Sequence, residues 1–225
     1  MRSLTGFVFF LGLSLIGSSV CWAVPPLKEA GVRELIPVSN WQKQFKITEG
    51  KDLGNVVPLT SVPPSNEKRW KLVFGNYAGI YLFQETSGEV IIERLDLFKS
   101  RNSIIYEPAL PIVPSDINSA NLIRRETGYQ MFNLDTGKLK RTGRVTHLLQ
   151  PASASQFDTP AGRLEGHYIE IDHIMEMEYR SQLHLTLGLG YRLNEGPIYG
   201  SARYSVTKLG VFTATKTAGA ALFSK

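Results

Sequence analysis

The clearest pattern in the chain is an alternation of apolar and polar residues near its C-terminal end. Every second residue from Leu183 to Leu193 is leucine or tyrosine, and polar or small residues stand between them. A second run, from Ile198 to Val206, alternates in the same way. Successive side chains of a strand point to opposite faces, so both runs predict strands with one buried face. The residues from Asn194 to Pro197 predict the turn between them.

Two hairpins are predicted earlier in the chain. The segment from Trp70 to Gln84 is rich in aromatic and β-branched residues, and Glu89 to Phe98 follows after the turn signal Glu85-Thr86-Ser87-Gly88. The second hairpin joins Gly128–Leu134 to Lys138–Leu149 through Asp135-Thr136-Gly137. Short glycine-containing connections between such runs are typical of hairpins.

The remaining segments of this half predict one long strand and three less regular stretches. The long strand runs from Arg163 to Tyr179, after a loop from Pro151 to Pro160. Three prolines between Tyr106 and Ile117 predict an edge strand or a crossing loop, because proline cannot donate a hydrogen bond to a neighbouring strand. The tail from Thr213 to Lys225 is predicted either to fray or to close the sheet as a last strand.

Residues 24–66 are punctuated by prolines and predict an irregular N-terminal segment. Two short helices are expected within it, one from Lys28 to Leu35 and one from Asn40 to Lys46, with Ser39 or Asn40 as the cap. The sequence therefore predicts an antiparallel β domain over residues 67–225. Its expected form is a curved sheet or an open half-barrel.

Residues 1–23 read as a secretory signal peptide. A positive start with Arg2 is followed by an apolar run from Gly6 to Ile16 and a small-residue exit at Ala23. The run is shorter than the ~20 residues that span a bilayer, and no later segment predicts a transmembrane helix in the mature chain. We therefore expect a periplasmic or secreted protein.

Cys21 is the only cysteine and leaves with the signal peptide if cleavage follows Ala23. The mature chain then has neither disulfides nor a thiol nucleophile. In the alternative, Cys21 is the lipid-modified first residue of a lipoprotein. Bacterial lipoprotein signals place a small residue just before the cysteine and a leucine-like residue three before it. Val20 and Ser18 match that pattern poorly, so a membrane-anchored lipoprotein is not expected.

Composition excludes little but argues against a nucleic-acid partner. The formal net charge of +5 falls to +4 once Arg2 is removed, and no Lys/Arg tract resembles an electrostatic footprint for nucleic acid. No phosphate-binding loop, dinucleotide fingerprint or serine-hydrolase elbow is present. We therefore predict no catalytic residues and no cofactor.

The segment from His167 to Glu178 holds two histidines and four carboxylates, which are all potential metal ligands. In a regular strand, His167 and His173 share one face with isoleucine and methionine residues, and the carboxylates point to the other face. The two histidines are also about 20 Å apart at ~3.3 Å per residue. We therefore predict a strand that is apolar on one side and acidic on the other, with no metal site.

An exported, cysteine-free chain of successive antiparallel strands resembles the curved half-barrel of the periplasmic lipoprotein carriers, over roughly residues 70–210. The resemblance implies a concave apolar face that holds a lipid or another hydrophobic small molecule. The aromatic residues of the first hairpin are the predicted ligand-binding set: Trp70, Phe74, Tyr77, Tyr81 and Phe83.

The leading functional prediction is thus a non-enzymatic, lipid-binding protein of the periplasm. Two alternatives stay open. One is a structural or assembly module of the cell envelope that binds another protein through a sheet edge or the 24–66 segment. The other is a metal-dependent hydrolase that uses the histidines.

Overall fold

The computed structural model describes residues 39–63, 69–85, 89–113, 122–177, 181–192, 195–208 and 211–224. The predicted signal peptide and the predicted helix from Lys28 to Leu35 lie outside these residues. Within the described part of the chain the secondary structure is β-strand, and no helix occurs there that is long and apolar enough to cross a membrane.

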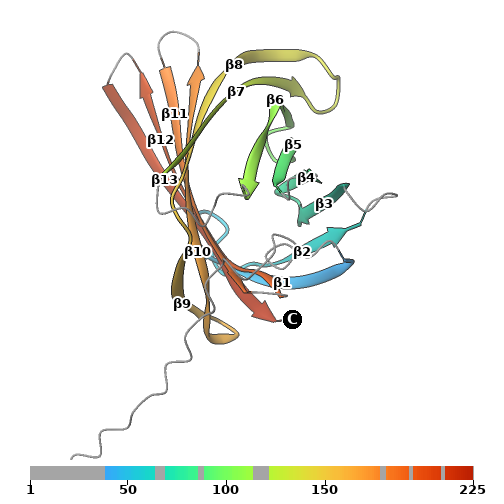
Figure 1. Cartoon of the computed structure of the whole chain (residues 1–225), viewed down its shortest axis with the longest axis vertical. Coiled ribbons are helices and arrows are strands. Elements are labelled where there is room, and N and C mark those ends of the chain that lie inside the picture. Colours follow the sequence, from blue (N-terminus) through green and yellow to red (C-terminus); the bar gives the residue numbers. More distant parts are fainter. Residues whose placement is uncertain are drawn as a thin grey trace, which may run out of the picture.

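Thirteen strands follow one another along the described chain (Figure 1). They are β1 (Trp41–Glu49), β2 (Val56–Val62), β3 (Arg69–Phe74), β4 (Ala78–Gln84), β5 (Val90–Leu97), β6 (Asn102–Val113), β7 (Ile123–Asn133), β8 (Leu139–Leu149), β9 (Ser153–Thr159), β10 (Gly162–Met177), β11 (Ser181–Arg192), β12 (Gly196–Lys208) and β13 (Val211–Ser224).

The sheet closes on itself through β10, so the predicted open half-barrel is wrong. One edge of β10 pairs with β11 from His167 to Met177. The other edge is shared: β9 pairs with its first half and β8 with Ile171–Met175. Neighbouring strands elsewhere are antiparallel, and β13 joins β12 to β1. The result is an antiparallel barrel of twelve strands, with β9 as an additional strand at one end.

The inside of the barrel is mainly apolar. Directly paired residues share a face, and the buried residues fall on alternate positions, as at Ile169, Ile171 and Met175 of β10. One buried cluster contains Trp70 and Leu72 of β3 together with the β10 isoleucines. These strands are not neighbours in the sheet, so the cluster fills part of the space between opposite walls.

The helix predicted from Asn40 to Lys46 is wrong, because this segment lies in β1. Phe45 and Ile47 are buried on the inner face of β1, and the strand pairs with β2 on one side and β13 on the other. A capping signal at Ser39 or Asn40 stabilises a helix by ~1 kcal/mol, which is less than burial of a single large apolar side chain contributes.

Several other elements differ from the pattern expected along the chain. The segment from Trp70 to Gln84 is a hairpin of β3 and β4 rather than one strand, and the expected loop from Pro151 to Pro160 contains β9. The proline-rich strand β6 lies between β5 and β7 in the sheet, but its pairing with β7 ends at Glu107, so the half that carries Pro108 and Pro111 pairs with β5 on one side only. Its residues near Pro108 have no partner in β5, since the pairing jumps from Leu110 to Ile105. The strand thus accommodates the proline by a local break in pairing.

The predicted hairpins and long strand are confirmed. β4 pairs with β5, β7 pairs with β8, and β10 covers most of the stretch expected to be one strand. β11 and β12 pair throughout. The C-terminal tail forms β13, which makes the last link of the barrel.

Candidate ligand-binding interior of the barrel

The inner wall formed by β10 and β11 is apolar between His167 and His173. Ile169 and Ile171 of β10 are paired with Leu189 and Leu187 of β11, so their side chains stand side by side on the inner face. The isoleucines are fully buried, whereas the leucines are only half-buried. The wall of β11 is therefore less completely covered than that of β10.

The inner wall is open next to these leucines. Gly200 of β12 is paired with Leu189, which places it on the same inner face. A Cβ atom added at Gly200 would meet no other atom within 4 Å. No described side chain covers the wall at this point.

A row of polar side chains crosses the same inner face on three strands. Arg125 of β7 is paired with His147 of β8, and His147 is paired with His173 of β10. The Nδ1 atoms of the two histidines are 3.4 Å apart, and both rings are buried. The rings meet edge to face with centroids 5.4 Å apart, and Tyr106 packs against His173 at 5.9 Å.

The environment keeps both imidazoles neutral. Burial, with smaller contributions from His173 and Arg125, lowers the pKa of His147 to about 3. Burial alone lowers the pKa of His173 to about 4. Because a neutral imidazole carries one N–H, the short Nδ1–Nδ1 contact requires opposite tautomers, one ring donating and the other accepting. At neutral pH the pair adds no charge to the apolar interior.

The strand from His167 to Met177 is arranged as the sequence predicts. His167, His173 and the isoleucines are buried on one face, while Glu170 and Asp172 lie half-buried on the other. Asp172 accepts a hydrogen bond from Thr186 of β11 at 2.7 Å. Among the described residues, no group of three or more His, Cys, Asp or Glu side chains has a metal-site arrangement. Glu178 lies outside the described residues.

The five aromatic residues predicted to bind ligand lie in different places. Trp70 is fully buried on the inner face, and Phe74, two residues further along β3, is half-buried on that face beside Phe45. Tyr77 lies in the turn between β3 and β4, with its ring 5.4 Å from that of Phe74. Trp70, Phe74 and Tyr77 therefore follow the inner wall toward one end of the barrel.

Tyr81 and Phe83 are on the outer face of β4. Tyr81 lies between Lys71 and Arg94, with the two cationic groups 4.7 and 5.0 Å from its ring centroid. Phe83 carries the guanidinium of Arg69 at 5.1 Å. The barrel thus separates these two aromatic side chains from Trp70 and Phe74.

The residue that sequence reasoning did not single out is His147. Its position in a predicted strand was correct, but its partner is 26 residues away and on a strand that is not its hairpin partner. The sequence holds one weak sign that His147 faces the interior: it alternates along the strand with the apolar residues Val145 and Leu149, which are both fully buried.

The chain matches no known family, and no curated protein is significantly similar to it. Among solved structures, a putative lipoprotein from Parabacteroides distasonis is similar over 81% of this chain and 93% of its own, with 10% sequence identity and a TM-score of 0.34. A likeness at this level carries no argument about the fold or activity of this chain.

The description of that protein contradicts one prediction. The sequence predicts a free periplasmic or secreted protein without a lipid anchor, whereas the protein that the comparison finds is described as a putative lipoprotein.

Proposed function

We propose that this protein is an exported, non-enzymatic binding protein that holds a hydrophobic ligand inside its barrel. The observation that carries the proposal is the half-buried leucine row of β11, from Leu183 to Leu189, on the inner face of a closed barrel. These apolar side chains face the interior and are incompletely covered. Covering them with an apolar ligand would favour binding by roughly 25 cal/mol per Å² of apolar surface removed from water.

The width of the barrel supports this proposal. An eight-stranded barrel is just wide enough for its own side chains to fill or for one small ligand, and the diameter grows with the number of strands. Twelve strands enclose a larger cross-section than that. The uncovered inner wall at Gly200 is consistent with an interior that the protein does not fill alone.

Trp70 and Phe74 are the aromatic residues best placed to contact such a ligand, because they share the inner face with the apolar clusters. Trp70 also has a buried Nε1 atom without a hydrogen-bond partner among the described residues. The outer residues Tyr81 and Phe83 are not part of the proposed interior site.

The test is a binding measurement with a neutral, environment-sensitive naphthylamine dye and a variant that fills the interior. Gly200→Phe places a large side chain next to Leu189, and Arg203→Phe adds the same side chain on the outer face of the same strand. We expect the wild type and Arg203→Phe to bind the dye and Gly200→Phe to bind it at least tenfold more weakly. Equal binding by both variants would place the dye elsewhere, and absence of binding to the wild type would overturn the proposal.

A further inference from the structure

A pocket of about 420 Å³ lies at the end of the barrel where three alternate hairpin turns come together. The turns connect β1 to β2, β3 to β4 and β5 to β6. In a meander, every second turn lies at the same end of the sheet, so residues far apart in sequence, such as Asp52 and Lys99, become neighbours there. The volume falls within the usual range for small-molecule sites.

One wall of the pocket is formed by the β3–β4 turn where it packs against β2. Gly75 begins the β3–β4 turn with φ of +45°, and its N–H donates to the carbonyl of Pro58 at 2.9 Å. A Cβ atom at Gly75 would collide with Val57, so the turn packs directly against β2. Val57 is buried behind this side of the pocket, and the half-buried Pro58 gives it a small apolar surface.

The charged residues of the pocket neutralise each other. The Lys99 ammonium lies 2.5 Å from a carboxylate oxygen of Asp52 and 3.9 Å from the ring centroid of Tyr77. The hydrogen bond to Lys99 lowers the pKa of Asp52, and the same bond raises the pKa of Lys99. An anion would have to displace Asp52 from Lys99, and a cation would have to displace Lys99 from Asp52.

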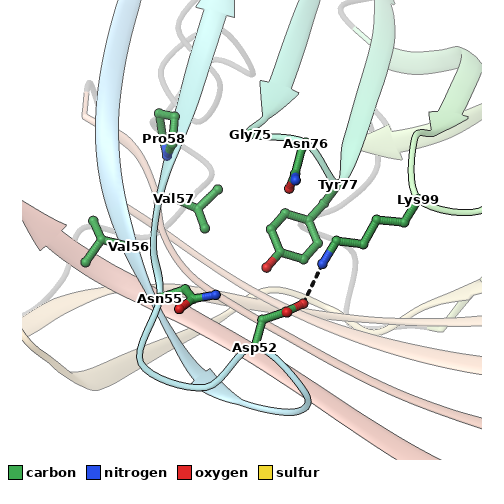
Figure 2. Close-up of a pocket in the computed structure, with 9 residues that line it drawn as sticks. All are labelled: Asp52, Asn55, Val56, Val57, Pro58, Gly75, Asn76, Tyr77 and Lys99. Atoms are coloured by element: carbon green, nitrogen blue, oxygen red, sulfur yellow. Dashed lines mark hydrogen bonds and ion pairs between the residues drawn. The ribbon is translucent and has the colours of Figure 1, made fainter.

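Two amides complete the polar surface. Figure 2 shows Asn55 beside Asp52 in one turn and Asn76 beside Tyr77 in the next. Each amide has an NH₂ group that donates and an oxygen that accepts. The ion pair likewise has N–H groups on Lys99 that donate and carboxylate oxygens on Asp52 that accept. The pocket therefore offers both donors and acceptors, without net charge, next to the small apolar surface of Pro58.

We propose that this pocket is a binding site for a neutral carbohydrate. Neighbouring hydroxyl groups of a sugar ring donate and accept at the same time, which matches the amides of Asn55 and Asn76 and the Asp52–Lys99 pair. The C–H face of the ring would pack on Pro58. Because Lys99 covers one face of the Tyr77 ring, recognition rests on hydrogen bonds and not on aromatic stacking. This site is separate from the proposed hydrophobic interior and does not depend on it.

Saturation-transfer NMR with D-glucose, N-acetylglucosamine and maltose tests this inference. We expect at least one of these sugars to receive signal from the full-length protein. The double variant Asn55→Ala/Asn76→Ala should bind that sugar roughly tenfold more weakly, because each net hydrogen bond changes affinity by a factor of a few. Both side chains are exposed, so the variant should keep the circular dichroism spectrum of the wild type. Gln42→Ala, an exposed amide on β1 outside the pocket, is the matched control and should bind normally.

Three outcomes would overturn the carbohydrate site. The first is that none of the three sugars receives signal from the wild type. The second is that binding is the same in the double variant, which would place the sugar elsewhere on the protein. The third is that glycine or inorganic phosphate displaces the sugar at comparable concentration, which would identify an ion-binding pocket. None of these measurements involves the dye that tests the barrel interior, so either proposal can fail alone.

Discussion

His147 and His173 face each other inside the barrel with their Nδ1 atoms 3.4 Å apart, although they come from different hairpins. Their Nε2 atoms are buried and have no hydrogen-bond partner among the described residues. The pair thus keeps one hydrogen bond between neutral rings in a setting where a charged imidazole would lie beside Arg125. The pairing of β8 with β10 brings the two rings together, and the contact between them requires that both histidines are neutral.

We predict that the free energy of unfolding decreases as the pH falls below about 6.5. Above that pH the histidines are neutral in both states, since an unperturbed imidazole has a pKa near 6.5. At lower pH the unfolded chain binds protons that native His147 and His173 bind only near pH 3 and 4. Each histidine contributes up to about 1.4 kcal/mol of lost stability per pH unit in this window. Urea unfolding between pH 7 and 5 measures the slope.

The control for this prediction removes the histidines. His147→Leu/His173→Leu should have a clearly smaller slope over the same pH range, whatever its absolute stability. A double variant that loses stability with pH as steeply as the wild type would show that other groups cause the effect.

A second prediction concerns the close approach of β8, β7 and β10 at Gly143. A Cβ atom there would lie 2.8 Å from the Glu176 carbonyl oxygen and 2.7 Å from the Tyr129 ring. That carbonyl accepts the hydrogen bond of the Tyr129 hydroxyl at 2.9 Å, so neither group can move without loss. Gly143→Ala should therefore destabilise the protein by about 1–3 kcal/mol, measured as the shift in urea midpoint.

Gly200→Ala is the matched comparison, because it is also a strand glycine but has open space at the Cβ position. Removing a strand glycine there should leave stability unchanged or raise it slightly. If both alanine variants cost the same, the crowding at Gly143 is not the cause.

The local elements of this barrel could be predicted from the sequence, but its closure could not. The strict alternation from Leu183 to Leu193 and the turn after it depend on residues close in sequence, and β11 and β12 are confirmed. The pairings that close the barrel join β1 to β13 and β8 to β10. No local pattern specifies such partners, so an open half-barrel and a closed barrel give the same sequence signal.

The candidate site shows the same limit at the level of single residues. Trp70, Phe74, Tyr81 and Phe83 were grouped because they are aromatic and close in sequence. The turn at Gly75 reverses the chain between them, and directly paired residues then share a face: Trp70 with Leu82 inside, Arg69 with Phe83 outside. The turn at Gly75 was not predicted, and without it the two faces cannot be told apart.

The last prediction concerns the outer face of β5, where Arg94 and Asp96 form a two-pronged ion pair. The Arg94 Nε and Nη2 atoms lie 2.7 and 3.1 Å from the two carboxylate oxygens. Asp96 is 2% exposed, so removal of its partner leaves a buried carboxylate without compensation. Arg94→Met should lower the free energy of unfolding by about 1.5–3 kcal/mol, the usual contribution of hydrogen bonds to a charged group.

Arg124→Met tests whether burial of the carboxylate is the reason for this cost. Arg124 also pairs with a carboxylate two residues further along its strand, Glu126, but both side chains of that pair are more than half exposed. Exposed ion pairs contribute 0–1 kcal/mol, so this variant should unfold at nearly the wild-type urea concentration. Adding Asp96→Asn to Arg94→Met should recover part of the lost stability, because the buried charge is then removed. If the second substitution destabilises the protein further, the cost of Arg94→Met arises from lost packing against Tyr81 instead.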